Sequence, residues 1–171
     1  ILKVLTQPDR KSGRGKKIKF SEVKEVALRE GIEVLQPESL KTDEFANTLR
    51  ELSPDLLLVV AYGIIVPKQI LEIPKYGCIN IHASLLPRWR GASPMEHAIL
   101  SGDKKSGITF MKMTEGLDEG PIFETHECNL NADDQLTDLE NKLFNLSKNN
   151  LIPFLKTVGE KNKLILQKDR D

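Results

Sequence analysis

The chain has 171 residues, a length that suits one domain of ordinary size with a single hydrophobic core. Its 25 Lys and Arg residues balance 25 Asp and Glu residues, which excludes an overall electrostatic attraction to nucleic acid, so any RNA contact must be local. No apolar run approaches the roughly 20 residues that a membrane span needs, and the first residues lack the apolar core and cleavage site of a secretory signal. We therefore expect a soluble protein that is not exported.

The first third of the chain predicts a strand followed by two helices. Residues 1–6 suit a strand, and because the chain begins inside it with Ile1, we expect that an earlier strand and helix have been lost. Ser21 can cap a first helix that Gly31 stops, and a second helix begins near Asp43. The apolar residues at helical spacing are Val23, Val26 and Ala27 in the first helix and Phe45, Leu49 and Leu52 in the second.

The strongest fold signal is the apolar run over residues 55–61, Asp-Leu-Leu-Leu-Val-Val-Ala. Such a run is typical of a strand covered by helices on both faces, and hence of a parallel sheet. A short helix over 68–72 and a strand over 78–83 are predicted next.

The rest of the chain continues the alternation of helix and strand. Ser93-Pro94-Met95-Glu96 combines a capping serine, a proline at the first helical position and a glutamate placed for a capping box, so it predicts a helix that ends near Leu100. The remaining predicted elements are strands over 108–113 and 122–128, a helix over 135–158 and a last strand over 163–167. Together they predict an α/β fold, a Rossmann-like, doubly wound and mostly parallel sheet with helices on both faces.

Two polar residues, Asn80 and His82, stand inside the apolar strand predicted over 78–83. Alternate residues share one face of a strand, so the amide and the imidazole should emerge together at its carboxyl end, where open sheets bind ligands. Asp118 lies in the turn Gly-Leu-Asp-Glu-Gly. Taken singly, His82 is more typical of a structural histidine, Asn80 of a strand-end amide and Asp118 of a turn residue.

Several motifs that follow one another along the chain indicate that these three residues act together. Residues 80–91 have the pattern Asn-x-His followed by Ser-Leu-Leu-Pro-x-x-x-Gly, and residues 116–120 have the pattern Gly-Leu-Asp-x-Gly. With these motifs the chain resembles the 10-formyltetrahydrofolate-dependent formyltransferases from about Leu5 to about Asn129. Residues 6–10, Thr-Gln-Pro-Asp-Arg, and residues 13–17, Gly-Arg-Gly-Lys-Lys, resemble the members that formylate methionyl initiator tRNA.

The resemblance implies transfer of a formyl group from 10-formyltetrahydrofolate, the co-substrate, to the α-amino group of methionyl initiator tRNA for translation initiation, without a metal. Asn80 and His82 would donate N–H groups to the developing oxyanion, and Asp118 would hold His82 and assist proton transfer, all three as catalytic residues. The residues implied to bind folate are Val60, Tyr62, Gly63, Ile64, Ile65, Ser84, Leu85, Leu86 and Pro87.

Residues 10–19, which we call the basic segment, contain six cations and no acidic residue. A charge run by itself usually faces water. By the resemblance, however, Arg10, Arg14, Lys16 and Lys17 become candidate contacts to the acceptor stem of the tRNA. The turn around Asp118 departs from the family pattern at two positions, because Glu119 replaces a frequent threonine and Pro121 replaces a common aspartate.

The resemblance also sets the expected extent and setting of the protein. Residues 1–171 would form a formyltransferase catalytic domain that lacks the family's first strand-helix unit and its C-terminal tRNA-binding domain. We expect a monomer with no membrane partner, in the cytoplasm, or in an organelle if the source is eukaryotic. Two alternatives stay open: a family member acting on glycinamide ribonucleotide, an amino-sugar nucleotide or water, and, in another class, a non-catalytic folate-binding domain.

Overall fold

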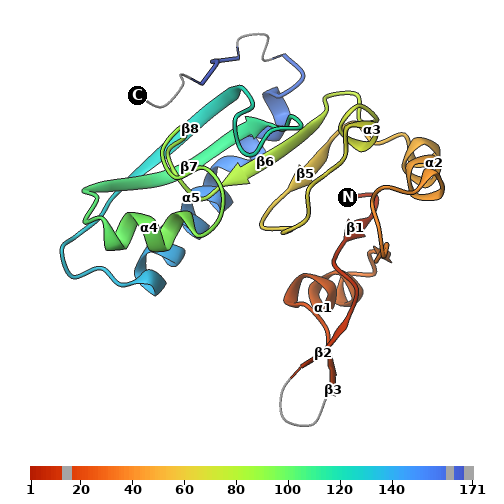
Figure 1. Cartoon of the computed structure of the whole chain (residues 1–171), viewed down its shortest axis with the longest axis horizontal. Helices are drawn as coiled ribbons and strands as arrows, with labels where there is room; N and C mark the ends of the chain where they lie inside the picture. The colour runs from red at the N-terminus through yellow and green to blue at the C-terminus, as the bar shows by residue number, and fades with distance from the viewer. Residues whose placement is uncertain (13–16, 161–163, 168–171) are drawn as a thin grey trace. The chain divides into compact units, whose positions relative to one another are not determined.

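The structure is a computed structural model that describes residues 1–12, 17–160 and 164–167 (Figure 1). Its contacts divide the chain into two compact units, which are treated one at a time below. The N-terminal unit comprises Ile1–Pro54 and Tyr62–Ile73, and the sheet unit comprises Asp55–Ala61 and Pro74–Asp171. That residues 1–171 form one catalytic domain stays a prediction.

Short strands make up much of the N-terminal unit. β1 (Val4–Leu5) pairs in parallel with β4 (Val34–Leu35), so the strand predicted over 1–6 is shorter than expected. β2 (Arg10–Ser12) and β3 (Lys17–Lys19) pair as an antiparallel hairpin. The sequence did not predict this hairpin, because the basic segment lacks the apolar alternation by which strands are recognised.

The first two helices of this unit begin where they were expected, and a side-chain hydrogen bond caps each of them. The Ser21 hydroxyl accepts from the backbone N–H of Lys24 at 3.2 Å, at the start of α1 (Glu22–Arg29). The Thr42 hydroxyl accepts from the N–H of Phe45 at 3.3 Å, at the start of α2 (Asp43–Leu52). These bonds satisfy N–H groups that the first helical turn leaves without a partner. A third helix, α3 (Lys68–Leu71), contacts α2.

Only one of the two predicted apolar helix sides is buried. α2 buries Phe45 and Leu49, as its spacing predicted, together with Ala46. In α1, by contrast, Ala27 is buried whereas Val23 and Val26 are 58% and 46% exposed. The helical spacing of these three residues is confirmed, but the two valines do not join Ala27 in a core.

Four strands form the sheet of the sheet unit in the order β5-β6-β7-β8 (Figure 1). Their bounds are β5 (Leu57–Val59), β6 (Cys78–His82), β7 (Lys105–Lys112) and β8 (Ile122–Asn129). β5 is parallel to β6, whereas β6 pairs with β7 and β7 with β8 in the antiparallel sense. The α/β fold is confirmed, but its pairing is more mixed than the mostly parallel sheet predicted. Residues 113–121, which join β7 to β8, are too few for the helical crossover that parallel neighbours require.

The two faces of this sheet differ in chemistry. On one face, Ile79 and Ile81 of β6 pack with Phe110 of β7 and with both helices of the unit, α4 (Pro94–Leu100) and α5 (Leu136–Thr157). The helical residues in this core are Ala98, Leu139, Leu143, Phe154 and Val158, which lies at the end of α5. The opposite face carries Asn80 and His82, as the alternation of β6 predicted, with Met111 and Thr109 opposite them on β7.

Three local predictions in the sheet unit differ from the structure. Leu57–Val59 is half-buried rather than buried on both faces, because β5 is an edge strand among the described residues. Ser93 has a left-handed backbone (φ 54°) and makes no side-chain cap, since capping side chains act from an extended backbone. Of the strand predicted over 163–167, the described part makes an isolated bridge from Ile165 to Ile122.

Within the described ranges, no helix combines the length and apolarity that crossing a membrane would require.

Candidate active site

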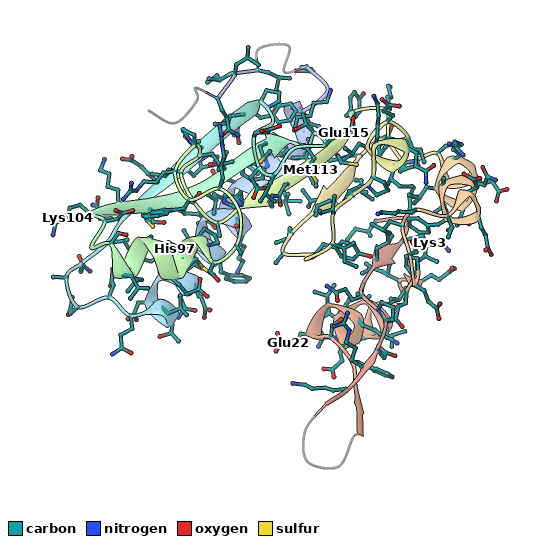
Figure 2. The ribbon with its side chains drawn as sticks, in the orientation of Figure 1. Lys3, Glu22, His97, Lys104, Met113 and Glu115 are labelled. Atoms are coloured by element: carbon teal, nitrogen blue, oxygen red, sulfur yellow. The ribbon has the colours of Figure 1, made fainter. Side chains whose placement is uncertain are left out.

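The structure brings Asn80, His82 and Asp118 together, and we call these three residues the polar cluster. Asn80 and His82 lie in the carboxyl-terminal half of β6, and Asp118 lies in the connection from β7 to β8. The first residues of this connection include Met113 and Glu115, which are labelled in Figure 2. The Asn80 amide donates to Oδ1 of Asp118 at 3.3 Å. Nδ1 of His82 lies 3.6 Å from Oδ2 of the same carboxylate. The predicted convergence of the three residues is therefore seen.

His82 is buried, and both of its ring nitrogens face a partner. Nε2 lies 2.9 Å from the backbone carbonyl of Trp89, and because a carbonyl can only accept, Nε2 bears a hydrogen. Nδ1 faces Asp118. The expected donation of a ring N–H to a substrate oxyanion therefore requires the substrate oxygen to replace one of these two partners.

The backbone around Asp118 holds its carboxylate in place. Asp118 has φ 51°, a left-handed conformation that side-chain-bearing residues adopt at a cost. Its Oδ2 also accepts from the backbone N–H of Gly91 at 3.0 Å. A Cβ on Gly120 would overlap the carbonyl oxygen of Lys112, which explains in steric terms the second glycine of the Gly-Leu-Asp-x-Gly pattern.

The two departures from the family pattern are accommodated in this turn. Pro121 accepts through its carbonyl from the N–H of Lys112 at 2.9 Å, and this bond does not use the N–H that proline lacks. Glu119 is exposed. With Glu119 and Pro121 in the turn, Asp118 still contacts Asn80, His82 and Gly91.

Residues 83–91 form the loop after β6, and buried hydroxyl groups fix its path. Thr109 on β7 donates to the Ser84 carbonyl at 2.7 Å and accepts from the Leu86 N–H at 3.1 Å. The Ser84 hydroxyl donates to the Arg88 carbonyl at 2.6 Å. Ser84 and Thr109 are fully buried, and their hydroxyl groups are both used in hydrogen bonds that hold the loop. The importance of Thr109 was missed, because a threonine in an apolar strand carries no distinguishing signal.

The apolar part of the same loop is only partly available to a ligand. Leu86 is buried against Met111 and Ile122, whereas Leu85 and Pro87 are half-buried. A Cβ on Gly107 of β7 would lie 2.7 Å from Leu85 and would also overlap a β8 carbonyl. The glycine thus makes room for this loop to lie on the sheet.

Several contacts fix the Trp89 side chain, and they help to keep the Trp89 carbonyl in place beside His82. Its indole N–H donates to Asp103 at 2.8 Å, and its ring stacks on His97 of α4, with centroids 5.2 Å apart (His97 is labelled in Figure 2). Arg88 forms two hydrogen bonds to Asp103, at 2.9 and 2.7 Å, and lies over the indole ring. The guanidinium group holds the pKa of the Asp103 carboxyl below its ordinary value.

The remaining candidate folate residues are divided between the two units. Val60, in the sheet unit, is 56% exposed. In the N-terminal unit, Ile64 and Ile65 are 38% and 76% exposed. Gln7 donates to the carbonyl of Tyr62 at 2.7 Å, and its amide would lie 3.1 Å from a Cβ on Gly63, a residue with φ 73°. Val60, Ile64 and Ile65 therefore do not close a core, the alternative role for apolar residues at these positions.

The base of the basic segment is anchored within the N-terminal unit. Lys24 of α1 donates to Asp9 and to Gln36, at 2.5 Å each, and Gln36 donates to Asp9 at 2.9 Å. The bond from Lys24 is the largest of the effects that lower the pKa of Asp9. Of the candidate tRNA contacts, Arg10 is exposed in β2. Arg14 and Lys16 lie outside the described residues, and only the backbone of Lys17 is described.

Among the residues that the structure describes, no three His, Cys, Asp or Glu side chains gather as metal ligands would.

Comparison with known proteins agrees with the geometry. The formyl transferase family model matches residues 1–155. A methionyl-tRNA formyltransferase of Caldanaerobacter subterraneus subsp. tengcongensis is 49% identical over 172 residues, which cover 100% of this chain and 55% of the relative. One of Francisella philomiragia is 52% identical over 159 residues, covering 92% of this chain and 51% of the relative. The chain thus spans about half the length of the curated relatives it matches.

Solved structures share the fold at lower identity. A phosphoribosylglycinamide formyltransferase from Anaplasma phagocytophilum superposes with a TM-score of 0.79 at 21% identity, covering 100% of this chain and 83% of that chain. A formyltransferase from Anoxybacillus kamchatkensis, in complex with UDP-4,6-dideoxy-4-formamido-L-AltNAc and tetrahydrofolate, superposes with a TM-score of 0.68 at 23% identity, covering 98% and 82%. With the family model matching most of its length, the chain belongs to the formyl transferase family.

Proposed function

We propose that this chain is the formyl-transferring part of a methionyl-tRNA formyltransferase, which moves a formyl group from 10-formyltetrahydrofolate to the α-amino group of methionyl initiator tRNA. The observation that carries the proposal is the convergence of Asn80 and His82 on Asp118 at the end of β6. The names of relatives that are 49% and 52% identical support the choice of acceptor. A monomer in the cytoplasm is part of the same proposal.

The reaction needs a donor for the developing oxyanion. Formyl transfer forms a bond from the amine nitrogen to the formyl carbon and places negative charge on the formyl oxygen. An amide nitrogen carries two hydrogens, so Asn80 can donate one to Asp118 and the other to that oxygen. His82 would add a second donor through Nδ1 in its imidazolium form, which carries a hydrogen on each ring nitrogen. The formyl oxygen would then replace Asp118 as the partner of Nδ1, while Nε2 stays with the Trp89 carbonyl.

The reaction also needs an acceptor for the proton that the amine loses. The Asp118 carboxylate is the basic group of the polar cluster, and backbone and side-chain donors already fix its orientation. It would receive the proton as the amine attacks and pass it to the nitrogen at position 10 of the folate as the old carbon–nitrogen bond breaks. These steps conserve atoms and charge without a covalent enzyme intermediate or a redox step.

Folate and tRNA would use residues outside the polar cluster. Exposed Val60, Ile64 and Ile65 are proposed to contact the pterin through their apolar surfaces. The remaining folate candidates are Tyr62, Gly63, Leu85, Leu86 and Pro87 through the backbone or partly exposed atoms, and Ser84, whose buried hydroxyl leaves it only an indirect part. Arg10, Arg14, Lys16 and Lys17 are proposed to contact phosphates of the acceptor stem.

The test is a formyl-transfer assay on the full-length enzyme that contains this chain. With 10-formyltetrahydrofolate as donor, methionyl initiator tRNA and glycinamide ribonucleotide are compared as acceptors, and Asp118→Asn serves as the inactive control. The proposal expects formylation of the tRNA alone, lost in the control. Transfer to glycinamide ribonucleotide instead would move the assignment to that acceptor. Folate binding without transfer to either would favour a hydrolase, an amino-sugar enzyme or a binding domain.

A further inference from the structure

Residues 164–167 of the sheet unit reach the active-site turn, although they lie beyond the residues that the family model matches. Ile165 and Ile122 exchange two backbone hydrogen bonds, at 2.8 and 2.9 Å, which places this segment beside the start of β8. Two positions later, the side chain of Gln167 turns to the connection that carries Asp118. The motifs of the sequence analysis do not include this glutamine.

Gln167 makes three hydrogen bonds that fix both ends of its amide. Nε2 donates to the carbonyl of Asp118 at 2.8 Å and to the carbonyl of Gly120 at 2.7 Å. Oε1 accepts from Nε of Arg90 at 2.9 Å. Because carbonyl oxygens only accept and the Arg90 Nε only donates, the partners require this orientation of the amide. Glutamine offers two donors and an acceptor in one planar group, and asparagine carries the same group on a shorter side chain.

These bonds close a ring around the proposed base. Gln167 holds the backbone of Asp118 on one side and Arg90 on the other, and the next residue, Gly91, donates its N–H to the Asp118 carboxylate at 3.0 Å. Asp118 has a left-handed backbone, which aspartate adopts more readily than most residues but still at a cost, so hydrogen bonds from outside the turn help to hold it. Gln167 supplies two such hydrogen bonds, to the carbonyls of Asp118 and Gly120.

We infer that Gln167 is a positioning residue for formyl transfer: it holds the Asp118 turn against the loop after β6, so that the Asp118 carboxylate stays aligned with Asn80 and His82. The inference rests on the proposed function. Gln167 acts through Asp118 and does not touch the reacting atoms. Its loss should therefore slow the chemical step and leave the binding of both substrates intact.

The test compares Gln167→Glu and Gln167→Met in the full-length enzyme with 10-formyltetrahydrofolate and methionyl initiator tRNA. Glutamate keeps an acceptor for Arg90 but removes both donations, and methionine removes all three bonds without adding charge. The neighbouring Leu166→Ala, at a side chain that is 79% exposed, is the matched control. Circular dichroism identifies the variants that are folded at the assay temperature.

In a folded variant we expect kcat to fall by about tenfold, with the KM of each substrate within about threefold of wild type, and no change in Leu166→Ala. A kcat that falls less than about fivefold, or a KM that rises as much as kcat falls, overturns the inference even though the unaltered enzyme transfers formyl groups. Absence of transfer by the unaltered enzyme would overturn the proposed function, and this inference with it.

Discussion

The polar cluster and the basic segment are proposed to serve different steps of formyl transfer, and they are held in different ways. The cluster is fixed by the register of β6 on β7 and by backbone partners of His82 and Asp118. The basic segment is anchored at its base, where Lys24 and Gln36 hold Asp9. Groups that must be aligned for a chemical step need fixed partners, whereas cations that bind phosphates need only to face solvent.

The largest effect should follow from removing the imidazole of the cluster. His82→Ala should lower kcat for formyl transfer by about 10³-fold and change the affinity for 10-formyltetrahydrofolate by less than about twofold, because His82 acts on the transition state. Steady-state kinetics and equilibrium binding measure the two quantities. His126→Ala, in a partly exposed histidine on β8, is the matched control. A parallel loss of folate affinity would instead make His82 a binding residue.

A second change tests whether buried hydroxyl groups fix the loop after β6. Thr109→Val preserves shape but leaves the Leu86 N–H and the Ser84 carbonyl without their partner. The free energy of unfolding should fall by about 2 kcal/mol, measured by urea denaturation. Thr125→Val is the matched control, because Thr125 lies opposite Thr109 on β8 but is exposed. Equal losses in both variants would show that the hydroxyl bonds contribute nothing specific.

The basic segment should affect binding and spare the chemistry. Arg14→Ala should raise the KM for methionyl initiator tRNA by about tenfold and reduce the salt dependence of tRNA binding by about one phosphate contact. Formyl transfer to a small amine acceptor should be unchanged. Arg29→Ala, in an exposed arginine on α1 of the same unit, controls for the loss of a positive charge. Equal losses with both acceptors would remove the basic segment from tRNA binding.

The smallest effect concerns Asp103, which accepts a hydrogen bond from the indole N–H of Trp89. Arg88 keeps the pKa of the Asp103 carboxyl below its ordinary value of 3.8, so folding favours the charged carboxylate. The charged Asp103 carboxylate stabilises the folded state fully at neutral pH. This stabilisation is lost as the pH falls from about 4 through the lower pKa that Asp103 has in the folded state. Asp103→Asn should cost about 1 kcal/mol of unfolding free energy at pH 7 and less at pH 3, by urea denaturation. A cost independent of pH would assign the effect to packing alone.

Much of the cluster was predictable because its signals are local. The alternation of β6 placed Asn80 and His82 on the face opposite Ile79. Outside the cluster, the capping residue Ser21 predicted the start of α1 in the same local way. The Asp118 turn followed from its glycines, one of which, Gly120, has no room for a Cβ beside the Lys112 carbonyl.

What was not predicted depends on contacts that leave no local pattern. The partner of His82 is a backbone carbonyl, which any residue at position 89 would offer. Gln167 reaches Asp118 from a distant part of the chain, and a single glutamine has no motif. The antiparallel pairing of β7 and β8 depends on the length of their connection, whereas apolar runs reveal burial and not direction.

The most direct test of the central claim, that the polar cluster performs the formyl transfer, is the single-turnover rate of Asp118→Asn in the full-length enzyme with both substrates saturating. The matched control is Asp133→Asn, an exposed carboxylate before α5. We expect a rate about 10³-fold below wild type, with unchanged dissociation constants for folate and tRNA and an unaffected control. A single-turnover rate within about tenfold of wild type would contradict the central claim, because proton transfer would then not depend on this carboxylate.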